Sequence, residues 1–215
     1  DEDRPLLGLL APAYLAEGGF EALMRQSRAF GVELRKRLDT AIRQDVLPPL
    51  GLELGKWARE GGRDLANDAE RGELEAAALT FVFRALFLLY AESAGHLPMG
   101  QESYARSSFS QVVQDAADQL ERLDRRSTQF SDRIRTLVGA MRTGNDALAV
   151  PAYNGDLFAA DGFEGSEVLE AVSFSDAALG PALVALGIDR ASGHGYDFSG
   201  LEIGHLGHIY EGLLS

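Results

Sequence analysis

The sequence contains no cysteine. This absence excludes disulfides, thiolate catalysis and zinc sites built on cysteine. Lysine is almost as scarce, since Lys36 and Lys56 are the only two. Neither lies in a glycine-rich loop that ends in Gly-Lys-Ser/Thr, which excludes a phosphate-cradling loop of that kind. Neither follows a glutamate at the second position before it, because Leu34 and Leu54 stand there. The Glu-x-Lys motif of a magnesium-dependent nuclease is therefore also absent.

Long uninterrupted hydrophobic runs are missing as well. The longest, from Ala76 to Ala91, is interrupted by Arg84 and falls short of the roughly 20 residues that a membrane span needs. We interpret it as a buried core helix and expect no membrane partner. The chain starts at Asp1 without a basic and apolar leader, so we expect a cytoplasmic segment of a longer polypeptide.

The composition is that of a globular chain with an acidic surface. Hydrophobic residues make up 46% and charged residues 25% of the 215 residues, which is enough apolar material for a packed core. The net charge of -13 argues against a protein that coats nucleic acid, which requires a basic surface. A local basic face remains compatible with this charge.

Apolar residues recur mainly at helical spacing, and turn residues separate the periodic stretches. The expected fold is all-α: a multi-helix, bundle-like domain with long irregular loops between its last helices. Pro48-Pro49 should end or kink the first long helix. Gly95 should end the central helix, Ser108 should cap the following one, and Ser175 should cap the helix that begins at Asp176. We divide the chain into a leading linker (1–19), a long helix with a kinked second helix (20–71), a central buried helix with an antiparallel helix pair (72–146), and an aromatic loop, a short helix and a terminal helix (147–215).

No complete catalytic or cofactor-binding motif is found. Pro151-Ala152-Tyr153 resembles a base-flipping motif but lacks its second proline, and residues 163–167 resemble a cofactor loop but lack its second glycine. No serine stands in a Gly-x-Ser-x-Gly turn. We therefore assign no catalytic and no cofactor-binding residue.

One histidine pair has the spacing of metal ligands. His205 and His208 would share a face of the terminal helix, and His194 could fold over that face. Histidines at such spacing are more often packing or surface residues, so no metal site is assigned. A small metalloenzyme built on these three histidines is kept as an alternative.

Arginines gather around the predicted turn between the paired helices. Their planar guanidinium groups suit phosphate oxygens, so Arg125, Arg126, Arg133 and Arg135 are candidates for contact with a DNA backbone. The competing interpretation is that they pair with nearby acids such as Asp132. An acidic helical module that docks another protein is a further alternative for the whole chain.

Three segments, in this order, resemble the helical region of type IIG bacterial restriction–modification proteins. The first runs from Phe83 to Pro98, the second from Pro151 to Phe158, and the third from Leu201 to Leu214. A common form of the third segment has serine where this chain has His208, which argues against a metal ligand there. The positions that carry the resemblance are Tyr90, Glu92, Pro151, Tyr153, Asn154, Gly155, Leu206, Gly207, Tyr210 and Glu211.

The resemblance implies a non-catalytic helical connector. Proteins of that family join a nuclease to an adenine-specific DNA methyltransferase, so the implied partners are DNA and the two flanking domains. The implied cofactors of the parent are S-adenosylmethionine and, where a nuclease is present, magnesium; none is expected in this segment. The implied role is to space the two active domains, with part of the helical surface along DNA phosphates.

Overall fold

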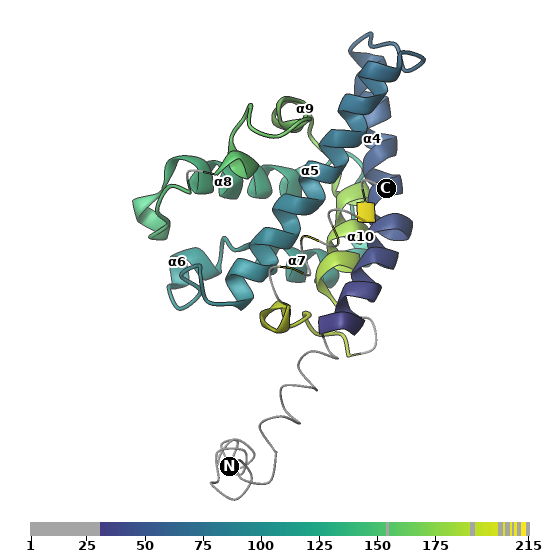
Figure 1. Cartoon of the computed structure of the whole chain (residues 1–215). Coiled ribbons are helices and arrows are strands. Elements are labelled where there is room, and N and C mark those ends of the chain that lie inside the picture. Colours follow the sequence, from purple (N-terminus) through teal and green to yellow (C-terminus); the bar gives the residue numbers. More distant parts are fainter. Residues whose placement is uncertain are drawn as a thin grey trace, which may run out of the picture.

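The computed structural model describes residues 31–153, 155–189, 192–201, 204, 207, 209, 212 and 213. These residues are mainly helical, and the only β-pairings among them are two isolated bridges, so the all-α prediction is confirmed. Residues 31–41 form a helix that continues into the later elements (Figure 1). In chain order these are η1 (Ile42–Val46), α4 (Leu47–Glu60), α5 (Asp68–Ser93), α6 (Glu102–Ala105), α7 (Phe109–Asp118), η2 (Leu120–Arg122), α8 (Gln129–Thr143), η3 (Asp146–Leu148), η4 (Asp156–Phe158), α9 (Ser166–Ala171), α10 (Asp176–Gly187) and η5 (Phe198–Gly200).

The first long helix passes through Pro48-Pro49 without ending there. A π-helical turn, η1, precedes the prolines, and the N–H of Leu47 bonds to the carbonyl of Ile42. The buried stripe Leu34, Leu38, Ile42, Val46, Leu50 and Leu54 repeats every four residues. Such a stripe drifts around an α-helix of 3.6 residues per turn, and the wider π turn takes up part of that drift. The path ends at Gly61-Gly62, as predicted, with Gly62 at a φ of 75°.

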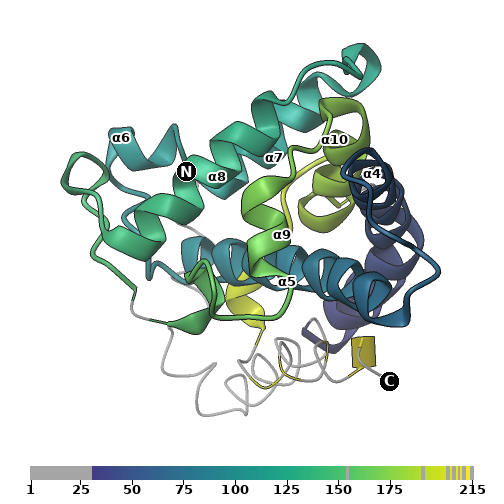
Figure 2. The ribbon, with the colours of Figure 1, turned by 90° about the horizontal axis from the view of Figure 1, so that it is seen from above.

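Helix α5 is the central helix, and Figure 2 shows it crossing the molecule from the α4 side to the α6 side. It starts at Asp68, because the Asn67 side chain accepts the N–H of Ala69. Gly95 follows its end with a φ of 73°, as predicted. By length and composition alone this helix could cross a membrane, but 67% of its most apolar stretch is buried inside the protein. The prediction of a core helix is thereby supported.

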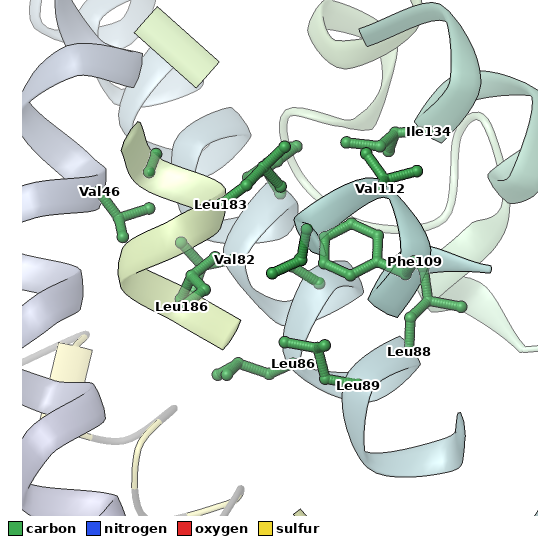
Figure 3. Packing of buried hydrophobic residues seen from close by; sticks show 14 of the residues in the cluster. Val46, Val82, Leu86, Leu88, Leu89, Phe109, Val112, Ile134, Leu183 and Leu186 are labelled. Carbon is green, nitrogen blue, oxygen red and sulfur yellow. The ribbon is translucent and has the colours of Figure 1, made fainter. Parts of the chain in front are cut away.

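Helix α10 is, after α5, the second helix that lies largely inside the core. It packs against η1, α4, α5, α7 and α8, and Figure 3 shows Leu183 and Leu186 between Val46 on one side and the residues of α5 and α7 on the other. Its two glycines allow close packing, since a Cβ at Gly180 would lie 2.5 Å from Leu123 Cδ1 and one at Gly187 would lie 2.6 Å from Val113 Cγ1. One continuous apolar core therefore includes the helices from Leu34 onwards.

The turn between α7 and α8 is held by the start of α10. The N–H of Asp176 bonds to the carbonyl of Ser127 at 2.7 Å, and the N–H of Ala177 bonds to that of Asp124 at 3.2 Å. In return, the Asp176 carboxylate accepts the N–H of Phe130 at 3.0 Å. Ser175 stands at the cap position of α10, but its side chain does not cap the helix as expected. Asp176 instead links the first turns of α8 and α10.

Candidate functional site

Two of the three resembling segments meet at the loop that carries Tyr153 and Phe158. Phe158 is buried, and its ring lies edge-on to that of Phe87 on α5, with centroids 5.4 Å apart. The Tyr153 hydroxyl donates to the carbonyl of His96 at 3.2 Å, and the Tyr153 N–H donates to Met141. Tyr153 and Phe158 therefore fix this loop onto the core.

The residues just before the third segment are joined to α5 through Ser93. The Ser93 hydroxyl lies 3.0 Å from Asp197 Oδ1 and accepts the N–H groups of Phe198 and Ser199, both at 3.1 Å. Leu201 is buried just beyond them. The first segment, which forms the C-terminal half of α5, thus contacts the second segment and the residues that lead into the third.

We refer to the contacts of α5 with the 153–158 loop and with residues 197–199 as the junction. Arg84 supports this junction from inside the core. Its side chain is 6% exposed, and it donates to the carbonyls of Leu157 (2.7 Å) and Ala159 (3.1 Å) and to the Ser166 hydroxyl (3.1 Å). Burial lowers the pKa of the guanidinium, and the nearby Glu170 opposes this effect. A single charge within an apolar run signals a buried polar network. The sequence could not show that its partners lie more than seventy residues away.

Glu92 caps a helix to which it is not adjacent in sequence. Its buried carboxylate accepts the N–H groups of Phe109 (2.7 Å) and Ser110 (2.8 Å), the Ser110 hydroxyl (2.5 Å) and the Tyr104 hydroxyl (2.9 Å). Ser108 also caps α7, as predicted, by accepting the N–H of Gln111. Burial raises the pKa of Tyr104 far above its usual value, and the neighbouring Glu92 charge adds to the effect. Glu92 is therefore a structural residue that fixes α7 against α5.

The remaining positions of the resemblance are spread over the surface of this junction. Tyr90 is half-buried beside the His96 ring, Pro151 is exposed, and the Gly155 N–H bonds to the Tyr153 carbonyl. Gly207 is helical and exposed. Four of the predicted positions lie outside the described residues: Asn154, Leu206, Tyr210 and Glu211.

The four candidate arginines differ in whether they bind acids within the protein. Arg133 binds Asp115 at 2.6 Å, joining α8 to α7, and Arg135 binds Asp132 at 2.9 Å and the Val172 carbonyl at 2.8 Å. These two guanidinium groups are committed to contacts within the protein, as the competing interpretation anticipated. The acid partner of Arg133 was not foreseen, because Asp115 lies eighteen residues earlier.

Arg125 and Arg126 lie at the tip of the turn together with Arg122. All three are exposed, and within the described part of the chain none forms an ion pair with a side chain. The turn is fixed by its hydrogen bonds to α10, so these guanidinium groups project from a rigid support. Their arrangement can bind an anion such as a phosphate without first breaking an internal pair.

The histidine alternative has one described member. The His194 N–H donates to the Ser192 hydroxyl at 3.3 Å, and its side chain is exposed. His205 and His208 lie outside the described residues. Among the residues that the structure describes, no three potential ligands gather as a metal site would require.

Comparison of the chain with protein-family models, curated proteins and solved structures finds no match.

Proposed function

We propose that this chain is a non-catalytic helical connector of a restriction–modification protein. Its parent would methylate adenine in DNA, with S-adenosylmethionine bound in a flanking domain and magnesium in a nuclease domain where one is present. Such a parent extrudes the target base from the duplex in the cytoplasm. The segment described here would set the distance and orientation between its neighbours.

The observation that carries this proposal is that the first resembling segment contacts both the second segment and the residues that lead into the third. Phe87 and Arg84 contact residues 157–159, and Ser93 binds residues 197–199. A connector must transmit position without deforming, and the buried hydrogen bonds of Arg84 make this part of the fold stiff.

The proposed DNA contact is the tip that carries Arg122, Arg125 and Arg126. Such a contact would be made to backbone phosphates, which position a protein without reading sequence. The chain as a whole is acidic, so binding would be confined to this tip and would be weak in isolation. Arg133 and Arg135 would help indirectly by holding α8 in place.

The test measures binding of the chain to a 20-base-pair duplex as a function of salt. Replacing all three tip arginines with alanine should make the salt dependence less steep by about 0.9 for each lost phosphate contact. A control of equal charge replaces three arginines that already pair with acids, Arg37, Arg71 and Arg106. Equal slopes for the two triple variants would contradict the proposal.

A second check concerns the parent. The natural protein should carry a Phe-x-Gly-x-Gly motif and an Asn-Pro-Pro-Tyr-like motif shortly after the position of Ser215. A natural protein that continues without either motif would contradict the connector role.

A further inference from the structure

A hollow of about 550 Å³ lies between the end of α4, the start of α5 and α9. Trp57 and Phe163 provide its aromatic surface, and both are partly exposed. Four carboxylates line it, Glu73, Asp161, Glu164 and Glu167, against a single cation, Arg63. We refer to this hollow as the acidic groove.

The wall of the acidic groove is fixed to the central helix. The Thr80 hydroxyl donates to the Glu164 carbonyl at 2.9 Å. Gly165 has a φ of 78°, and a Cβ there would lie 2.2 Å from the backbone nitrogen of Ala77. The loop from 161 to 165 therefore rests directly on the backbone of α5, so its backbone is held in place before any ligand arrives.

At one end of the groove, a cationic side chain of the protein itself already occupies the aromatic and acidic surface. The Arg63 guanidinium carbon lies 5.1 Å from the centre of the Trp57 ring, and Arg63 also binds Glu73 at 2.8 Å. A cation over an aromatic face beside a carboxylate is a favourable arrangement for a guanidinium or an ammonium group.

The other end of the groove offers the same groups without a cation. Asp161, Glu164 and Glu167 are exposed, and in the described part of the chain their carboxylates form no ion pair. Phe163 is the aromatic neighbour, and Val168 provides a buried apolar floor. Phosphates would be repelled here, which excludes the groove as a second DNA contact.

We propose that the acidic groove docks a cationic segment of a partner protein, in which arginine or lysine side chains alternate with apolar ones. The cationic groups pair with the three free carboxylates, and an apolar side chain covers Phe163 and Val168. The charge complementarity selects this class of partner and accelerates its association. The proposal uses no residue of the arginine tip and stands independently of the proposed function.

Trp57 is the only tryptophan, so its fluorescence reports directly on the groove. The probe is the peptide acetyl-Arg-Leu-Arg-Arg-Leu-Arg-amide, titrated into the full chain at 0.15 M salt. We expect a saturable fluorescence change with this peptide and none with the same peptide in which glutamate replaces arginine. A change that does not saturate, or no change, would overturn the proposal.

The variant Asp161→Asn, Glu164→Gln, Glu167→Gln should weaken binding of the arginine peptide about tenfold. A matched control removes the same charge elsewhere, through Asp118→Asn, Glu121→Gln and Asp146→Asn, and should change the affinity less than about twofold. All six positions are exposed, and thermal unfolding checks that both variants remain folded. Equal weakening by the two variants would show nonspecific attraction to an acidic protein and overturn the proposal. So would a dimer of the chain that only the groove variant abolishes, because a second copy would then be the occupant.

Discussion

Glu92 caps helix α7 across seventeen residues of sequence, with its Oε1 2.7 Å from the backbone nitrogen of Phe109. The same carboxylate also accepts hydrogen bonds from Ser110 and Tyr104. One buried side chain thus satisfies backbone N–H groups that the first turn of an α-helix leaves free. The resemblance pointed to Glu92, and the structure gives the position a physical role.

Replacing Glu92 with alanine should destabilise the fold by about 3 to 4 kcal/mol, because four donors lose their acceptor in a buried site. Glu92→Gln should cost less, since the amide oxygen can still accept. Urea unfolding at equilibrium gives both values. The exposed Glu102→Gln is the control and should change stability by less than about 0.5 kcal/mol. If Glu92→Ala cost no more than this control, the proposed cap would be wrong.

Arg84→Met should destabilise the protein by about 3 kcal/mol, because two loop carbonyls and Glu170 lose a buried donor. The effect should be local as well, with faster amide hydrogen exchange over residues 156–166. Arg84→Lys should rescue little, since an ammonium group cannot reproduce the planar set of donors. Full rescue by lysine would show that charge alone matters at this position.

Two glycine-to-alanine substitutions should change the stability of the fold in opposite directions. Gly165→Ala should destabilise by about 3 kcal/mol, because the new Cβ collides with the backbone of Ala77 and φ is 78°. Gly139→Ala lies within α8, where no atom stands within 4 Å of the added Cβ. It should stabilise by about 0.5 to 1 kcal/mol through helix propensity. Thermal unfolding of both variants tests the packing of the 161–165 loop on α5.

The contact between Ser93 and Asp197 should affect how the free energy of unfolding changes at acidic pH. The Ser199 hydroxyl chiefly holds the pKa of Asp197 below its usual value; partial burial opposes this shift, and the Ser199 N–H and the Ser93 hydroxyl reinforce it. A carboxyl with a depressed pKa in the folded state stabilises the fold above its unfolded pKa of about 3.9, and this contribution is lost as pH falls through the folded value. Asp197→Asn should therefore flatten the stability profile below about pH 4. In a Ser93→Ala variant, an NMR titration should show a higher pKa for Asp197.

Local signals allowed much of the fold to be predicted. Helical spacing identified the buried stripe from Leu34, the core helix around Phe87 and the pair that became α7 and α8, since these patterns repeat over several turns. Ser108 and Gly95 marked helix ends because their chemistry acts within a few residues. The short α9 was missed, because residues 163–167 were interpreted as a loop.

The contacts that build the junction could not be predicted, because they join distant parts of the chain. Nothing near Arg84 in sequence indicates Leu157 or Ser166, and nothing near Glu92 indicates Phe109. The prolines at 48 and 49 predicted a helix end or a kink; the helix continues through them, and the π turn before them keeps the buried stripe aligned. Likewise, the ion pairs of Arg133 and Arg135 separate them from Arg125 and Arg126 only once the helices are packed.

The most direct measurement of the connector account is a site-specific crosslink to DNA. Because the chain has no cysteine, Arg125→Cys creates a single attachment point for an azidophenacyl photocrosslinker. The control is Arg106→Cys just after the end of α6, at another exposed arginine, which is paired with Glu102. With a 20-base-pair duplex at low salt, the account predicts crosslinking from position 125 and none from position 106. Equal crosslinking from both positions, or none from position 125, would contradict it.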